Sequence, residues 1–334
     1  MNKMKEQIKQ LVSIGSLCMM LLTSGQIIAQ STPAPKYNSV EPIAMGNFNQ
    51  WVVREIEESA ILGGNKRLLF EVAPTDTVIG NIAYKANPKS PWATSNVMAN
   101  VGVTKTSVTV FPEKRDNGQC ARLETRMENC KVLGIVNITV LASGTLFLGE
   151  VQEPIKSTKN PQSKLAMGVP FTKRPKALLL DYKMKVTGEK DRIKATGFSK
   201  ISDVPGEDYA EITILLQKRW EDADGNIFAK RVGTGSERIH KTTPNWINEH
   251  PVEVLYGDIR SNAKFKPQMQ LYTGDDVKYA KNKAGKVVPI QEVGWADANE
   301  QPTHLMVQIS SSHGGAYIGS PGNTIWVDNV KLAY

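Results

Sequence analysis

The last thirty residues constrain the fold of this chain most strongly. Between residues 305 and 309 apolar side chains alternate with others, which is the period-2 pattern of a half-buried β-strand. A glycine-rich turn follows, and a second apolar run spans residues 325–334. The apolar parity of this run slips at Asp328 and Asn329, which predicts a β-bulge. A chain that ends in two such strands is predicted to close an all-β sandwich.

The same alternation recurs upstream, and neither an internal repeat nor a long amphipathic helix is found. An Asp-Gly turn at 222–225 predicts a hairpin between two of the strands, and the polar stretch 187–208 is expected to form a long loop. A turn at 142–144 is expected to join two strands within 131–151. Further predicted strands lie at 67–74, 106–115, 177–186, 211–220, 226–232 and 264–274, and another contains Val252 and Val254.

The N-terminus predicts export. Basic residues precede an apolar run at 11–22, and small residues follow it, as in a secretory signal peptide of residues 1–29. Residues 30–40 are then a flexible leader, and 41–334 form a single large β-domain, with a small separate N-terminal subdomain as the alternative. The mature chain is expected in the periplasm, at the cell surface or secreted.

Four motifs carry a resemblance to a known family. They are PWATSN (91–96), CARLET (120–125), FTKRPKALLLDYK (171–183) and GNTIWVDNVKLAY (322–334). With them the chain resembles the Putative carbohydrate metabolism domain family, whose members are secreted or envelope-associated β-jelly-roll proteins of Bacteroidota. The resemblance is strong over 91–334 and looser over 41–90. It implies a jelly-roll β-sandwich like that of carbohydrate-binding modules, and a role in glycan uptake or processing.

Composition and motifs exclude several functions. The net charge of +8 is spread along the chain without a basic cluster that interleaves aromatic residues, so nucleic acid is not an expected partner. No nucleophile elbow, zinc helix, phosphate loop or dinucleotide fingerprint occurs. The four histidines lack metal-ligand spacing. A pair of carboxylates could still hydrolyse glycosides, so the sequence leaves enzymatic activity open while favouring none.

Saccharide recognition needs planar polar groups around an apolar face. Trp92, Trp246 and Trp295 are the predicted stacking residues, although for Trp92 alone a loop anchor of the core is the better interpretation. The predicted polar contacts are Asn96, Arg122, Glu124, Asp181 and Asp258. An ordinary solvated ion pair remains the alternative for Arg122 with Glu124, as do flanking lysines for Asp181.

Two further predictions concern Cys120, Cys130 and Asp328. An oxidising compartment permits a disulfide between the two cysteines across a hairpin that turns near Thr125, and two buried free thiols are the alternative. The resemblance to carbohydrate-binding modules implies a structural calcium at Asp328. The alternative is that Asp328 and Asn329 satisfy the backbone where the strand ladder breaks.

The sequence therefore predicts an exported protein that binds an oligo- or polysaccharide without catalysis. A glycoside hydrolase-like enzyme and a structural surface protein without a small ligand are the alternatives. A cleft with two facing carboxyl groups favours the enzyme, whereas exposed aromatic side chains without such a pair favour binding.

Overall fold

The two strands that end the chain lie in two different sheets. The computed structural model describes residues 37–132, 136–157, 159–188, 192–197 and 200–334, so the predicted signal peptide lies outside the described residues. Strand β25 (His304–Ser310) lies within a ten-stranded sheet, and β27 (Thr324–Ala333) within a six-stranded sheet. No α-helix occurs in the described ranges, which confirms the all-β prediction. No helix of this part of the chain is long and apolar enough to cross a membrane.

The six-stranded sheet carries two bulges. Leu179 of β15 pairs with Lys331 of β27, and Asp181 pairs with Asp328, so one residue between these pairs on β15 lies opposite two residues on β27. One of those two, Asn329, has a φ of 51°. The bulge predicted at Asp328 and Asn329 is thereby confirmed. The sheet runs β21 (Ile247–Glu253), β15 (Ala177–Lys185), β27, β9 (Gly118–Glu124) and β8 (Val110–Arg115), with β1 (Val40–Pro42) also paired to β27.

The ten-stranded sheet includes a closed barrel of seven strands, because β12 pairs with β25 as well as with β13. The barrel is mixed, since β20 with β24 and β13 with β23 are parallel pairs. Its strands are β12 (Thr145–Val151), β13 (Leu165–Met167), β19 (Ala210–Glu221), β20 (Ile227–Ile239), β23 (Tyr279–Lys281), β24 (Val287–Trp295) and β25. The predicted hairpin at 222–225 joins β19 to β20. Strands β5 (Trp92–Thr94), β14 (Val169–Pro170) and β22 (Leu255–Tyr256) extend the sheet.

Short elements complete the chain. The 3-10 helices are η1 (Ala60–Leu62), η2 (Pro161–Lys164), η3 (Pro267–Met269) and η4 (Gly274–Asp276). The smaller sheets contain β2 (Trp51–Glu57), β3 (Lys66–Val72) and β4 (Asp76–Ile79); β6 (Val97–Asn100) and β7 (Thr104–Ser107); β10 (Arg126–Val132), β11 (Val136–Ala142) and β17 (Thr196–Gly197); and β16 (Ile193–Lys194), β18 (Ser202–Asp203) and β26 (Ile318–Gly319).

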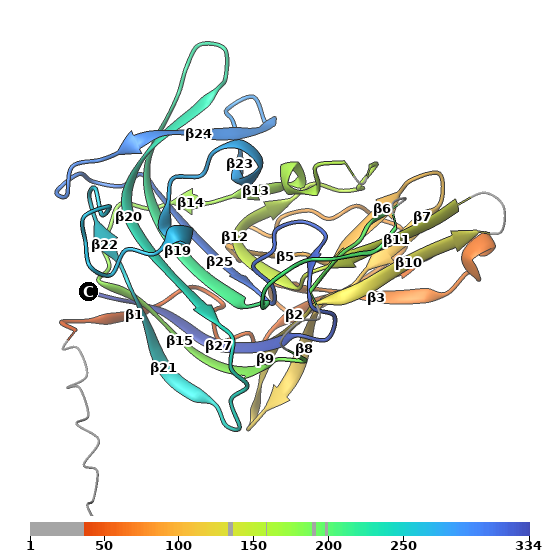
Figure 1. Ribbon diagram of the computed structural model, residues 1–334. Coiled ribbons are helices and arrows are strands. Elements are labelled where there is room, and N and C mark those ends of the chain that lie inside the picture. The colour runs from red at the N-terminus through yellow and green to blue at the C-terminus, as the bar shows by residue number, and fades with distance from the viewer. Residues whose placement is uncertain (1–36, 133–135, 158, 189–191, 198–199) are drawn as a thin grey trace, which may run out of the picture. The chain divides into compact units, whose positions relative to one another are not determined.

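The protein has two apolar cores, because alternate side chains of β19 and β25 point to opposite faces of their sheet. In Figure 1 the layer of β15 and β27 lies below the layer of β19 and β25. One face of β19 and β25 packs against the six-stranded sheet, and the opposite face fills the barrel. Each fully buried aliphatic side chain contributes about 1.5–3 kcal/mol to such cores. The main core contains Leu178, Leu180, Ile212, Ile214, Val307, Ile309, Ile325 and Val327, and the barrel core contains Phe147, Leu215, Ile227, Ile290 and Met306.

A glycine allows the barrel to close beside β13. Gly149 on β12 has a φ of 144°, and a Cβ atom at this position would lie 2.1 Å from the carbonyl oxygen of Ala166. Only a residue without a side chain tolerates both the backbone angle and this approach.

Several predictions about the fold, the strands and the loops differ from the structure. The pairings include a closed barrel, and they do not show a jelly-roll sandwich. The turn predicted at 142–144 between two strands is confirmed, because β11 ends at Ala142 and β12 begins at Thr145, although the two strands pair with other strands rather than with each other. Residues 264–274 were expected to form a strand, but they contain η3 instead. The loop predicted at 187–208 contains β16, β17 and β18.

The predicted disulfide is also wrong, because Cys120 and Cys130 are both free and buried. Strand β9 pairs with β8 and β27, whereas β10 pairs with β11 in another sheet. The chain therefore crosses between sheets at Thr125 instead of turning back in a hairpin, and the alternative of two buried thiols is correct.

Candidate functional site

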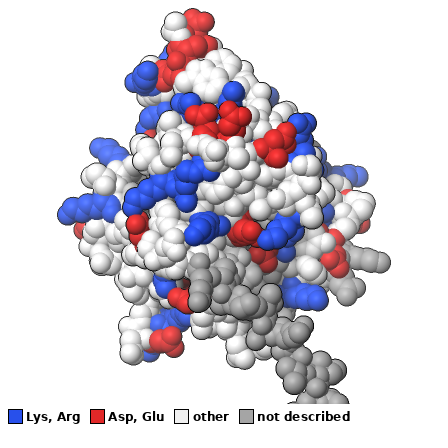
Figure 2. Space-filling view, turned by 90° about the vertical axis from the view of Figure 1, so that its left-hand side faces the viewer, with Lys and Arg blue, Asp and Glu red and all other residues white. Residues whose placement is uncertain are grey.

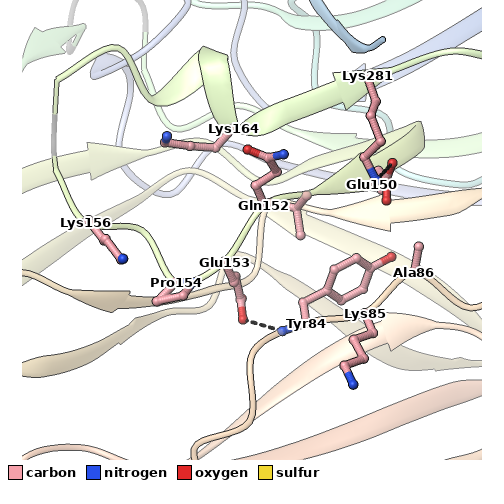
Figure 3. Close-up of a pocket in the computed structure, with 11 residues that line it drawn as sticks. Tyr84, Lys85, Ala86, Glu150, Gln152, Glu153, Pro154, Lys156, Lys164 and Lys281 are labelled. Carbon is pink, nitrogen blue, oxygen red and sulfur yellow. Dashed lines mark hydrogen bonds and ion pairs between the residues drawn. The ribbon is translucent and has the colours of Figure 1, made fainter. Parts of the chain in front are cut away.

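A pocket of about 670 Å³ lies beside the rim of the barrel (Figure 3). A volume of this size suits a ligand of one or two sugar rings. Its lining is polar and contains four lysines. The lining residues are Tyr84, Lys85, Ala86, Glu150, Val151, Gln152, Glu153, Pro154, Lys156, Lys164 and Lys281.

The pocket has two walls that come from distant parts of the sequence. Figure 3 shows Gln152 and Lys164 on one side and Tyr84 and Lys85 on the other. The first wall is built by the antiparallel pair of β12 and β13, with η2 leading into β13. The second wall is the segment that follows β4. No single sequence motif therefore contains the site.

Several polar groups around the pocket have no hydrogen-bond or ion-pair partner within the part of the chain that the structure describes. They are the amide of Gln152, the hydroxyl of Tyr84 and the ammonium groups of Lys85, Lys156 and Lys164. By contrast, Lys281 forms an ion pair with Glu150. Amide, hydroxyl and ammonium groups left free around one cavity are suited to bind a hydroxyl-rich ligand.

A buried ion cluster fixes the floor of the pocket. The carboxylate of Glu153 accepts hydrogen bonds from the backbone N–H groups of Tyr84 and Met98, both at 2.8 Å. It also lies 2.5 Å from Nη2 of Arg54 on β2. These charge-assisted hydrogen bonds hold the two walls together, and they leave the Glu153 side chain 0% exposed.

A second glutamate shares this arginine. Nη1 of Arg54 donates to Glu71 at 3.2 Å and to Glu153 at 3.1 Å. Burial raises the pKa of Glu71 to about 8, and the negative charge of Glu153 adds to this rise although Arg54 opposes it. The raised pKa favours the protonated, neutral form of Glu71 near pH 7.

The hydroxyl of Thr94 is consistent with a protonated Glu71. Its oxygen lies 3.2 Å from the carbonyl oxygen of Phe70 and 3.0 Å from Oε2 of Glu71. A hydroxyl has one hydrogen and can donate to only one of these acceptors. If Glu71 carries a proton, it donates to Thr94, and Thr94 donates to Phe70. Both short contacts are then satisfied.

The outer face of the six-stranded sheet carries Arg115 and five of the residues predicted from sequence, which are Arg122, Glu124, Asp181, Trp246 and Asp328. Nη1 of Arg115 contacts Asp181 and Asp328, each at 2.9 Å, and its guanidinium lies 3.9 Å from the ring centre of Trp246. On β9 of the same sheet, Arg122 and Glu124 form the ion pair that was the alternative interpretation.

The aromatic rings of this face are covered by cations. Lys183 lies 4.4 Å from the ring centre of Trp326, and Arg122 lies 4.2 Å from that of Phe111. Arg115 covers Trp246 in the same way. Cation–π contacts of this kind occupy the ring faces on which a sugar would stack.

Trp92 and Asn96 belong to the core, and their predicted roles as ligand contacts are not supported. Trp92 is 2% exposed, packs edge-on against Phe48 and donates through Nε1 to the carbonyl of Ala44 at 2.9 Å. It is the core anchor of the alternative interpretation. Asn96 is fully buried, and its side chain bonds to the backbone of Phe70, Thr109 and Val110.

Asp258 and Trp295 lie apart from the other predicted residues. Exposed Asp258 binds Arg260 two residues later, at 2.6 Å. Trp295 packs against a small cluster that includes Ile259 and Met269. Neither residue lines the pocket.

At Asp328, where calcium was expected, the structure has the side chain of an arginine. Arg115 supplies a positive charge at Asp328, where calcium was expected, and also contacts Asp181. No group of three or more His, Cys, Asp or Glu side chains in the described ranges is arranged to hold a metal ion. The backbone N–H of Asn329 donates to Asp328 at 2.7 Å, as the alternative interpretation requires at a bulge.

Sequence inspection missed the pocket because its residues carry no pattern. Lys156 and Lys164 lie in or beside a polar segment without apolar period, and Tyr84 and Lys85 lie in an irregular segment. It also missed Trp220, which is 44% exposed and stacks on Phe228 in the hairpin of β19 and β20. Alternation along β19 offered no signal for this residue, since Trp220 shares the parity of the main-core residues Ile212 and Leu216.

A comparison with family profiles confirms the family resemblance. The sequence profile of a family described as "Putative carbohydrate metabolism domain" matches residues 70–333. No curated protein matches the chain. A structure described as a putative glycoside hydrolase from Bacteroides thetaiotaomicron is 18% identical, with 84% of this chain and 70% of that chain covered and a TM-score of 0.44. Another of that description, from Bacteroides vulgatus, is 16% identical, with coverages of 90% and 97% and a TM-score of 0.41.

Proposed function

The chain belongs to the Putative carbohydrate metabolism domain family, and from this premise we propose that it binds an oligo- or polysaccharide in the pocket beside the barrel rim. The protein acts at the bacterial envelope, after export directed by its N-terminal segment. It recognises the glycan without cleaving it. The polar groups of the pocket replace the tryptophans as the recognition residues.

The observation that carries the proposal is the set of free polar groups around the cavity. The amide of Gln152 and the hydroxyl of Tyr84 both donate and accept hydrogen bonds, as sugar hydroxyls do. The ring of Tyr84 lines the same cavity, and its cation, Arg54, lies 5.9 Å from the ring centre, farther than the 3.9–4.4 Å of the cations on the outer sheet face. The outer face of the six-stranded sheet is less suited, since cations cover its rings.

The carboxyl groups near the pocket favour binding over hydrolysis. Glycoside hydrolysis needs two carboxyl groups that face each other across a sugar. Glu71 lies outside the lining, and the side chains of Glu71 and Glu153 are only 6% and 0% exposed. Glu150 is the remaining acid of the lining, and Lys281 neutralises it.

The surface charge is consistent with a glycan rather than a nucleic acid. On the face drawn in Figure 2, basic and acidic side chains are interspersed instead of forming one basic field. Nucleic-acid binding draws on a continuous basic surface.

The test is a binding assay with the chain that lacks residues 1–29, on a panel of plant, host and bacterial glycans, with product formation followed in the same samples. Gln152→Ala removes a free amide, and Gln152→Trp fills the cavity. We expect both to weaken binding, by about tenfold or more for the tryptophan variant. Trp326→Ala on the outer sheet face is the matched control.

Each other outcome has a definite meaning. Product release would assign an enzyme in place of the binding protein. Loss of binding in Trp326→Ala alone would move the site to the six-stranded sheet. Silence across the panel would overturn the proposed function.

A further inference from the structure

We infer that the pocket selects acidic saccharides, that is, glycans that carry carboxylate or sulfate groups. This inference rests on the proposed function and adds the chemical class of the ligand. Neither the family nor the two similar structures assign this preference.

The charges of the lining do not cancel. It contains four lysines and two glutamates. Arg54, outside the lining, already neutralises Glu153, and Lys281 neutralises Glu150. Three cations therefore remain without an acidic partner in the described ranges of the chain: Lys85, Lys156 and Lys164.

The unpaired lysines surround the cavity instead of lying on one strand. Lys85 follows β4, Lys156 follows β12, and Lys164 ends η2. Figure 3 shows Lys164 on the wall of Gln152, Lys85 on the wall of Tyr84, and Lys156 at the end of the pocket opposite the pair of Lys281 and Glu150. Cations on several sides of one cavity raise the local concentration of anions and favour charged groups spaced along a chain.

A neutral glycan gains little from these ammonium groups, because each keeps its water shell when only hydroxyls are offered. An acidic glycan exchanges that water for charge-assisted hydrogen bonds, which are stronger than neutral ones. For lysines that are partly exposed, each contact is expected to change affinity by about two- to fivefold at low salt. Three together then give a preference of at least about tenfold.

The experiment compares saccharides that differ in charge alone. Isothermal titration of the chain that lacks residues 1–29 is performed with oligogalacturonate and with the same oligomer as its methyl ester. A sulfated galactose oligomer of equal length separates sulfate from carboxylate recognition. Inorganic polyphosphate reports attraction to negative charge without a sugar. Each titration is repeated at about 50 and 300 mM NaCl, where screening differs strongly.

The variant is the triple substitution Lys85→Gln, Lys156→Gln and Lys164→Gln. The matched control removes the same charge from exposed lysines outside the lining, with Lys114→Gln, Lys241→Gln and Lys266→Gln. Circular dichroism verifies that both proteins are folded. We expect at least about tenfold weaker binding of the acidic oligomer in the pocket variant only, together with loss of its advantage over the ester.

The results separate this inference from the proposed function. Equal affinity for acid and ester, or an unchanged triple variant, would refute acid selection while leaving glycan binding in place. Equal binding of polyphosphate would show that charge alone is recognised, which also refutes it. If no saccharide of either charge binds, the proposed function fails with the inference.

Discussion

Replacing Glu71 by glutamine tests whether a neutral acid lies beneath the pocket. Burial raises the pKa of Glu71 from 4.5 to about 8 in the folded chain. The unfolded chain releases this proton near pH 4.5, so between about pH 4.5 and 8 the folded state binds one more proton. The stabilisation from Glu71 is thus complete below pH 4.5 and is lost as the pH rises toward 8.

The magnitude follows from the size of the shift. Each pKa unit corresponds to about 1.4 kcal/mol, so a shift from 4.5 to about 8 costs the wild type up to about 5 kcal/mol at alkaline pH. Glu71→Gln has nearly the same shape and keeps a donor toward Thr94 and an acceptor for Arg54, but it cannot ionise. The variant should therefore become more stable than the wild type by an amount that grows between pH 5 and 8.5.

Urea unfolding followed by tryptophan fluorescence measures this difference at half-unit pH steps. Equal slopes of free energy against urea would verify that both proteins unfold similarly. Glu57→Gln, at the exposed last residue of β2, is the control and should run parallel to the wild type. A difference for Glu71→Gln that stays constant with pH, or a wild type that gains on the variant as the pH rises, would show that Glu71 is ionised and would refute the reasoning.

Three further outcomes are expected. Arg115→Met leaves the buried carboxylates of Asp181 and Asp328 unpaired and should cost about 3 kcal/mol in urea unfolding, whereas Arg260→Met beside exposed Asp258 should leave the midpoint unchanged. Gly149→Ala should lower stability by about 2 kcal/mol or more, since its Cβ meets the carbonyl of Ala166; a melting temperature equal to that of wild type would contradict this. In the chain without residues 1–29, Ellman's reagent should label no thiol before unfolding and two after it, because burial raises the pKa of Cys120 to about 12 and Cys130 is also buried; rapid labelling of the native protein would contradict this.

Local pattern predicted the strands of this chain well. The alternation over 177–186 identifies β15, with Leu178 and Leu180 on the buried side. The parity slip at Asp328 locates the bulge of β27. Both depend on side chains within a few residues of one another, which is the range over which sequence reports structure.

Pairing was not predictable from the same pattern. The barrel closes because β12 pairs with β25, more than 150 residues away, and the sequence of neither strand indicates which strand it pairs with. The pocket shares this difficulty, since its walls come from the segment after β4 and from the region around β12 and η2. Its lysines resemble any solvated loop until the fold brings them around one cavity.

Asp181 and Asp328, which the sequence predicted as ligand and metal contacts, both lie at breaks in the strand ladder. Both neighbours of β15 carry an extra residue beside Asp181: β27 bulges at Asn329, and β21 shifts its register near Glu249. Each bulge has a residue with positive φ, 51° at Asn329 and 52° at Glu249.

Asp181 binds both bulges. Its carboxylate accepts from the backbone N–H of Glu249 at 2.7 Å and from Nδ2 of Asn329 at 2.8 Å. Arg115 then neutralises Asp181 together with Asp328. An acid inside a strand can thus indicate a break in the ladder as readily as a ligand. Polar groups that are left free around a cavity distinguish a ligand site from a break in the ladder. In this protein such groups lie around the pocket, which makes the pocket a better candidate site than the sheet.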